Sequence, residues 1–160
     1  MNLIIMKKVI ILALIVSIII LIYYNLFNIN KKTISDLTDK WCNEVTINHN
    51  PTTISNLFCN DGNLVGTVSQ VKRKGNDIKL YFDYFAKLPN IRILKKIYNI
   101  SKVTSNVYIN TAFITWQWDG LDEPIIARMT FIFRNKCIFQ LHSSALPAIN
   151  NSLLKISGNS

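Results

Sequence analysis

An uninterrupted apolar run stands out near the start of the chain, from Val9 to Phe27, where nineteen consecutive positions carry no charge. At about 1.5 Å per residue, a helix of this length spans roughly 28 Å, close to the hydrocarbon thickness of a bilayer. A small domain has no room to bury a helix that is apolar on every side. Lysine pairs flank the run, namely Lys7, Lys8, Lys31 and Lys32. The pattern predicts one transmembrane helix at about 9–27, within a head-and-anchor segment of residues 1–32.

This run is longer than the apolar region of a signal peptide, about 7–15 residues, and no small-residue cleavage site follows it. Both observations favour an anchor that is not cleaved. The head before the run contains no acidic residue, whereas Asp36 and Asp39 follow the second lysine pair. Because positive charge is retained on the cytoplasmic side, we expect a single-pass membrane protein with its domain on the non-cytoplasmic side.

Helical spacing begins after the anchor. From Thr33 onward an apolar residue recurs every three or four positions, which predicts an amphipathic helix. Its stripe consists of Ile34, Leu37, Trp41 and Val45. Pro51 suits the first turn of a second, short helix. Residues 77–88 predict a third helix, which ends before Pro89.

The remaining segments have the character of turns and strands. Before the third helix, residues 60–63 predict a turn, residues 64–68 a short strand and residues 72–76 a polar loop. Four later runs are rich in β-branched and aromatic residues: Ile91–Ile100, Asn106–Trp118, Pro124–Arg134 and Lys136–Ala145. This order predicts an α+β domain over residues 33–148, with three N-terminal helices packed on a curved antiparallel sheet. We expect a flexible tail at 149–160.

Charge excludes one class of partner. The 160 residues carry a net charge of +9, but residues 1–32 hold four lysines and no acid. The rest of the chain has 14 basic and 9 acidic residues, a net +5. Its basic residues are scattered, whereas proteins that bind nucleic acids concentrate them on one face with aromatic residues between. We therefore expect no nucleic-acid partner.

The three cysteines do not form a metal-binding pattern. Cys42, Cys59 and Cys137 lack C-x-x-C spacing and have no paired histidines nearby, so we expect no metal and no cofactor. An odd number leaves at least one thiol unpaired in the monomer. Cys42 and Cys59 could bridge two helices in an oxidising space, but three buried thiols acting as small hydrophobic groups are the favoured interpretation.

Several motifs occur in the order typical of one known superfamily. They are Leu-Phe-Cys-Asn-Asp-Gly at 57–62, Gly-Thr-Val-Ser at 66–69, Tyr-Phe-Asp-Tyr-Phe at 81–85, Ala-Arg-Met-Thr-Phe-Ile-Phe at 127–133 and Leu-His-Ser-Ser-Ala-Leu-Pro at 141–147. Over about residues 36–147 the chain resembles the nuclear transport factor 2-like (NTF2-like, SnoaL-like) superfamily. The branch it resembles is related to the association domain of calcium/calmodulin-dependent protein kinase II. The resemblance implies a cone-shaped domain with a pocket between helices and sheet, and pairing of two copies through the open sheet face.

The resemblance also suggests candidate ligand-binding residues. In the kinase association domain the pocket carries two arginines and a histidine. Arg128 matches one arginine, while Ser143 stands at the position of the second and Tyr81 at that of the histidine. We expect these three residues and His142 to line the cone and to bind a small polar or anionic molecule.

The sequence leaves open both the partner of Arg128 and the β6 residue that lies opposite it. Its charge could instead form a salt bridge to Asp83 or Glu123. A two-residue turn at 135–136 would place Arg128 opposite Ser143, whereas a three-residue turn would place it opposite His142, and only one of these can share its face.

Strand parity also separates the aromatic residues of the longest strand. Trp116 and Trp118 should share one face and Phe113 should lie on the other. No complete catalytic set can be assembled, and His142 lies outside any G-x-S-x-G motif. We therefore expect a membrane-anchored module that binds a small molecule or associates with itself as a dimer. The alternatives are a lyase or isomerase acting on a lipophilic substrate in the cone, and a scaffold component of a membrane assembly.

Overall fold

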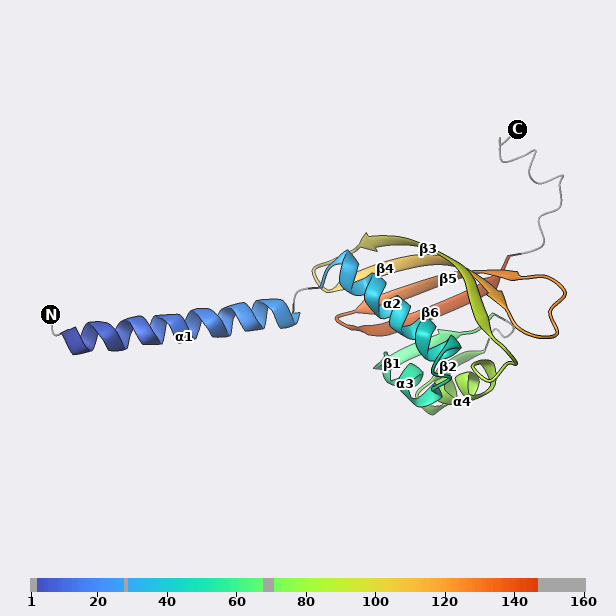
Figure 1. Ribbon diagram of the computed structural model, residues 1–160, viewed down its shortest axis with the longest axis horizontal. Coiled ribbons are helices and arrows are strands. Elements are labelled where there is room, and N and C mark those ends of the chain that lie inside the picture. Colours follow the sequence, from blue (N-terminus) through green and yellow to red (C-terminus); the bar gives the residue numbers. More distant parts are fainter. Residues whose placement is uncertain (1–2, 28, 68–70, 147–160) are drawn as a thin grey trace, which may run out of the picture.

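The computed structural model describes residues 3–27, 29–67 and 71–146. Helix α1, Leu3–Phe27, extends away from the rest of the chain (Figure 1). Its described side chains, those of residues 6–20, are all exposed. Among the described residues, no helix combines the length and the apolar character needed to cross a membrane. The expected strand end at Val68, and the tail at 149–160, lie outside the described residues.

Three short helices follow, as the apolar spacing predicts. They are α2 (Lys31–Thr46), α3 (Pro51–Asn56) and α4 (Asn76–Phe85). The side chains of Asn30 and Asn50 accept hydrogen bonds from backbone amides in the first turns of α2 and α3, which satisfies donors that the helices leave unpaired. The apolar stripe of α2 is buried except for the partly exposed Leu37.

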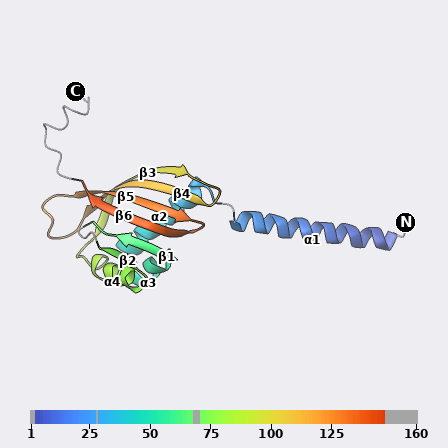
Figure 2. The same cartoon turned by 180° about the vertical axis from the view of Figure 1, so that it is seen from behind.

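Six strands form one curved sheet (Figure 2). They are β1 (Phe58–Val65), β2 (Lys72–Lys74), β3 (Arg92–Lys102), β4 (Val107–Gln117), β5 (Ile125–Arg134) and β6 (Cys137–Ala145). Their order across the sheet is β2-β1-β6-β5-β4-β3. The prediction of a fully antiparallel sheet is wrong, because β1 pairs with β6 in parallel. Strand direction depends on the path of the whole chain, which local apolar alternation does not encode.

The predicted turn at 60–63 is also wrong, since these residues lie inside β1. A register irregularity between Phe58 and Asn63 accommodates them against β6. A Cβ added to Gly62 would lie 2.8 Å from the carbonyl oxygens of both Cys59 and Ile138. Glycine is therefore needed here for close approach of two backbones rather than for a turn. The polar loop expected at 72–76 contains the short edge strand β2.

The core lies between the helices and the inner face of the sheet. Every second residue of β4 is buried, including Ala112, Ile114 and Trp116. Trp41 of α2 packs edge-on against the rings of Trp116 and Phe131, with centroids 6.1 and 5.3 Å apart. This arrangement is typical of aromatic pairs in cores, and it ties α2 to the middle of the sheet.

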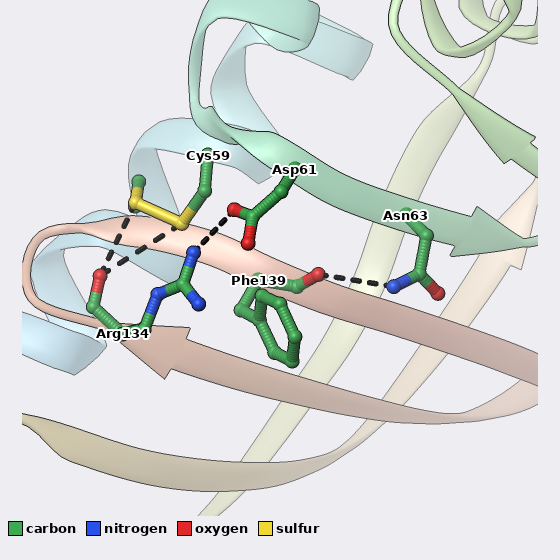
Figure 3. Close-up of a disulfide and its surroundings, with 6 residues drawn as sticks. Cys59, Asp61, Asn63, Arg134 and Phe139 are labelled. Atoms are coloured by element: carbon green, nitrogen blue, oxygen red, sulfur yellow. Dashed lines mark hydrogen bonds and ion pairs between the residues drawn. A yellow bond between two sulfur atoms is a disulfide. The ribbon is translucent and has the colours of Figure 1, made fainter.

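A disulfide joins Cys59 at the start of β1 to Cys137 at the start of β6 (Figure 3). The prediction of a free, buried thiol is confirmed for Cys42 alone. It is wrong for Cys59 and Cys137, which are bonded to each other, and the Cys42–Cys59 bridge that was considered is also wrong. The bond closes the parallel β1–β6 pair, which the sequence pattern did not reveal. Beside it, Arg134 forms an ion pair with Asp61 and lies over the ring of Phe139 (Figure 3).

Candidate functional site

A pocket of about 280 Å³ lies between the inner face of the sheet and helices α2 and α4. Its floor is formed by side chains that are buried in the core, among them Trp41, Phe82 and Leu141. Its mouth lies where β4 ends and β5 begins, because the exposed or partly exposed lining residues Tyr84, Trp118 and Ile125 gather there. The cone expected from the resemblance is thus hollow at this end of the domain.

Aromatic rings make up much of the pocket wall. Phe85 of α4 packs edge-on against Trp116 and Trp118, with centroids 5.4 and 6.3 Å away. Tyr81 stacks on Phe85 one helical turn earlier. With Trp41 on the floor, all three tryptophans of the chain line the pocket. The two tryptophans of the longest strand share this face, as parity predicts.

One polar region interrupts the aromatic wall. The hydroxyls of Thr67 and Ser143 lie 2.6 Å apart, and one of them donates to the other. This pair therefore keeps one hydroxyl hydrogen for a further acceptor. The Tyr81 hydroxyl lies close to Gly66, where an added Cβ would come within 2.7 Å of its oxygen. The hydroxyl groups of Thr67, Ser143 and Tyr81 thus lie where α4 meets β6 and the end of β1.

The Tyr81 hydroxyl stays protonated in this setting. Burial raises the pKa of Tyr81, while the charge of Arg73 and a hydrogen bond to the backbone of Thr67 partly oppose that rise. The Arg73 guanidinium lies over the Tyr81 ring, 4.9 Å from its centroid. A neutral phenol can donate a hydrogen bond to a ligand but cannot act as a base near neutral pH.

No lysine, arginine, histidine, aspartate or glutamate is among the lining residues in the described part of the chain. The described residues also contain no cluster of side chains suited to hold a metal ion. The pocket can therefore enclose an apolar body and offer hydroxyl donors to it. It presents neither a charge to pair with an anion nor a general base.

The four predicted site residues divide between two faces of the sheet. Tyr81 and Ser143 line the pocket, as predicted. Arg128 and His142 do not; both are exposed on the outer face, where Arg128 lies opposite Ser144. The expectation that all four gather in the cone is therefore wrong.

A β-bulge explains why Ser143 faces the pocket and His142 does not, whereas the face of Arg128 follows from the unbroken alternation of β5. The turn at 135–136 has two residues, since Arg134 pairs with Cys137, and an unbroken register from there would bring Arg128 opposite Ser143. The register shifts by one between Ile132 and Phe133, because β6 has an extra residue at this point. A shift of one exchanges the faces of all later partners.

Arg128 does not form the alternative salt bridge to Asp83. Its guanidinium lies over the ring of Phe113, 5.5 Å from the centroid, on the outer face. Asp83 of α4 pairs instead with Lys87, which lies four residues later, just beyond the end of that helix. Phe113 therefore lies on the face opposite Trp116, as parity predicts.

Sequence reasoning missed part of the site. Gly66 and Thr67 lie just beyond β1 and were noted only as part of a family motif, although they complete the polar region with Ser143. Met129 and Ala127 also line the pocket, from β5. Alternation along β5 would have identified them, because Ala127 and Met129 alternate with the exposed Ile126 and Arg128.

Comparison with known proteins gives structural likeness but no sequence family. No family profile matches the chain, and no curated protein does. A protein from Xanthomonas campestris, provisionally named a calcium/calmodulin-dependent protein kinase II association domain, aligns with a TM-score of 0.60 and 24% identity. The alignment covers 72% of this chain and 87% of that protein.

Two further structures share the architecture. A protein of the NTF2-like family from Streptomyces avermitilis, provisionally named a dehydratase, has a TM-score of 0.64 and 13% identity over 73% of this chain and 96% of its own. A protein from Novosphingobium aromaticivorans, provisionally named an aromatic ring hydroxylase, has a TM-score of 0.61 and 14% identity over 74% and 90%. These likenesses, together with the helices packed on a curved mixed sheet, show that the chain has the NTF2-like fold.

Proposed function

We propose that the domain binds a small, neutral, mainly apolar molecule in the pocket between its helices and sheet. The observation that carries this proposal is the character of the lining: aromatic and aliphatic side chains enclose about 280 Å³, and the polar side-chain groups among them are uncharged hydroxyl and indole N–H groups. Apolar ligands bind in such cavities through burial of their surface, and a few placed donors set their orientation. A carbonyl, ether or hydroxyl oxygen would suit the donors of Tyr81, Thr67 and Ser143.

We further propose that residues 1–32 anchor this domain in a membrane. The support is the charge-free run from Val9 to Phe27 and the lysine pairs on both sides of it. The Cys59–Cys137 disulfide favours the non-cytoplasmic side, because such bonds persist in oxidising compartments. Flotation of the full chain with lipid vesicles after an alkaline wash tests the anchor, since an integral segment resists this wash and a peripheral one does not.

A matched pair of probes tests ligand binding. 2-Acetylnaphthalene and 2-naphthoate have the same ring system, but the first carries a neutral carbonyl and the second a carboxylate. We expect calorimetric binding and a raised melting temperature with the ketone. Binding of the anion should be much weaker, because burying an unpaired charge is costly. Preference for 2-naphthoate would contradict the proposal and restore the anionic ligand expected from the sequence.

Variants on the two faces of the sheet supply the controls. Ala127→Leu fills the pocket from β5 and should abolish binding of 2-acetylnaphthalene. Ser144→Leu adds similar bulk on the outer face of β6 and should leave binding unchanged. Tyr81→Phe removes one donor and should weaken binding by about 2- to 10-fold, the net worth of one hydrogen bond.

Self-association is a second candidate function, and a different surface favours it. The outer face of the sheet is not covered by α2–α4, and Ile97 and Ile126 are 51% and 40% exposed there. Phe113 lies between them with Arg128 over its ring. Apolar residues ringed by polar ones are typical of contact surfaces between subunits. We propose that two copies pair through this face.

Light scattering of the purified full chain in a mild detergent tests this pairing. Ile126→Glu places a charge in the centre of the face and should convert dimers to monomers. Leu80→Glu is the control, because Leu80 is similarly exposed but lies on α4, away from the sheet. A monomer at all concentrations, or equal effects of both variants, would count against pairing through the sheet.

The enzyme alternative has less support. A lyase or isomerase needs a group that removes or delivers a proton, and the titratable side chains in the described lining of the pocket are Tyr81 and Tyr84. Burial raises the pKa of Tyr81, which opposes its use as a base. We therefore propose binding without assigning a reaction.

A further inference from the structure

The anchor and the pocket mouth lie at opposite ends of the sheet. The hydroxyl of Tyr108, near the start of β4, donates to the carbonyl of Ile29, which holds the α1–α2 junction at that end. Trp116 and Trp118 stand at the other end of the same strand and line the pocket. Eight residue steps separate Tyr108 from Trp116, or about 26 Å at strand rise. Figure 1 shows α1 and the far end of β4 on opposite sides of the domain.

Basic residues gather at the end of the domain that joins α1. The register brings together the end of β3, the starts of β4 and β6, and the end of β5, because Lys102 pairs with Tyr108 and Arg134 with Cys137. The backbone amide of Asn135 donates to the carbonyl of Asn106, which joins the two turns. The basic residues of this end are Lys31, Lys32, Lys102, Arg134 and Lys136.

Acidic residues at this end only partly balance that charge. Asp36 pairs with Lys32, and Asp61 pairs with Arg134. Five basic and two acidic residues leave a net of three positive charges beside the anchor. The loop at the opposite end of β4 has the reverse sign, since Asp119, Asp122 and Glu123 are exposed there with no basic residue among 118–124. Arg92 of β3 pairs with Gln117 beside this loop, and its charge offsets one of the three negative charges.

From this asymmetry we infer that the basic end of the domain rests on anionic phospholipid headgroups of the membrane that holds α1, and that the pocket mouth faces away from the bilayer. The inference rests on the proposed anchoring. Headgroup charge attracts basic residues within about a Debye length of the surface and repels the acidic loop. The ligand then exchanges with the aqueous phase at the far end of the domain and not directly with lipid.

A competing orientation would use the edge strand β2. Lys72, Arg73 and Lys74 lie along this edge, and Lys72 pairs with Val65 near the pocket mouth. If this edge faced the bilayer, the mouth would lie close to the headgroups and the tryptophans would approach the lipid. The two orientations therefore differ in the height of the pocket above the membrane.

The three tryptophans provide the measurement, because all of them line the pocket. The full chain is reconstituted in vesicles that contain dansyl-labelled lipid, with either phosphatidylcholine alone or a mixture with phosphatidylglycerol. Energy transfer from tryptophan to dansyl reports the mean height of the pocket. We expect weaker transfer in the anionic vesicles, where the domain is held upright, and loss of this difference at high salt.

Charge variants at the two ends of β3 form a matched set. Lys102→Glu, alone or with Lys31→Glu, removes charge at the anchor end and should raise transfer in anionic vesicles to the value in neutral ones. Arg92→Glu makes the same change at the mouth end of β3 and should leave transfer low. Iodide in the aqueous phase should quench Trp118, which is partly exposed at the pocket mouth, in both vesicle types.

Three outcomes would overturn the inference. Transfer that is equal in both vesicle types and insensitive to Lys102→Glu excludes the electrostatic contact. Transfer that is stronger in anionic vesicles, and is reduced by Lys72→Glu with Lys74→Glu, shows that the β2 edge faces the bilayer. A chain that does not float with the vesicles overturns the anchoring and this inference together, whereas the calorimetric test of ligand binding stays independent of both.

Discussion

Removal of the Cys59–Cys137 disulfide should produce a large and specific loss of stability. The two cysteines are 78 positions apart. Closing a loop of that length lowers the entropy of the unfolded chain by an amount worth up to about 4.5 kcal/mol at 25 °C in the chain-entropy model. Measured losses for native disulfides are about 2–5 kcal/mol. We therefore expect Cys59→Ser with Cys137→Ser to cost roughly 2–4 kcal/mol.

Thermal unfolding of the full chain in mild detergent measures this loss. For a domain of this size about 1 kcal/mol corresponds to roughly 4 °C, so the melting temperature should fall by about 8–16 °C. Tryptophan fluorescence is the probe, because all three tryptophans are in the folded domain. A reductant should lower the melting temperature of the wild type to that of the double variant and leave the variant unchanged.

Cys42→Ala is the matched control, since Cys42 is free and buried. It should lower stability through lost packing but should not remove the response to reductant. A double variant that melts within about 4 °C of the oxidised wild type would refute the argument that the bond restrains the unfolded chain. Alkylation and mass spectrometry confirm that the wild type carries the bond in the assay.

Three further predictions concern single positions. Burial raises the pKa of Cys42 from 9.0 to about 11; the unfolded thiol ionises first, so wild-type stability should fall between pH 9 and 11 by as much as about 2.7 kcal/mol more than that of Cys42→Ala, measured by urea unfolding. Gly62→Ala should cost about 1–3 kcal/mol in the same assay, because the new Cβ meets two backbone carbonyl oxygens; a neutral effect would contradict the close approach of β1 and β6. Phe131→Ala should cost about 3–5 kcal/mol, whereas Phe113→Ala on the outer face should cost about 1 kcal/mol or less in the monomer; equal losses would show that the two faces are wrongly assigned.

Helices and most strands were predictable because their signals are local. The stripe that contains Ile34 and Trp41 recurs at helical spacing, and it is the face that α2 buries. The alternation of β4 placed Phe113 opposite in face to Trp116 without reference to any other strand. Buried residues recur every 3.6 positions in a helix and every 2 in a strand because of backbone geometry alone, so each period can be recognised within one segment.

The candidate site was less predictable because it depends on pairing between segments. Tyr81 and Ser143 were correctly placed in the pocket, but Arg128 was assigned to the wrong face of the sheet. The outward position of Arg128 follows from the alternation of β5, in which Ala127 and Met129 on either side of it are buried. One extra residue in β6 turns Ser143 inward and His142 outward, and composition does not reveal such a bulge. The apolar lining that favours a neutral ligand follows from this alternation, which keeps the charge of Arg128 on the outer face.

The sequence by itself determined the elements: an apolar N-terminal helix, three further helices, and strands whose alternate residues face a common core. Only the tertiary structure decided which strands are neighbours, and hence that β1 runs parallel to β6, that Cys59 meets Cys137, and that Ser143 and not His142 faces the pocket. The physical reason is the distance along the chain over which the deciding contacts act. Periodicity is a property of consecutive residues, whereas register, disulfide partners and the lining of a cavity are fixed by contacts between residues far apart in the chain.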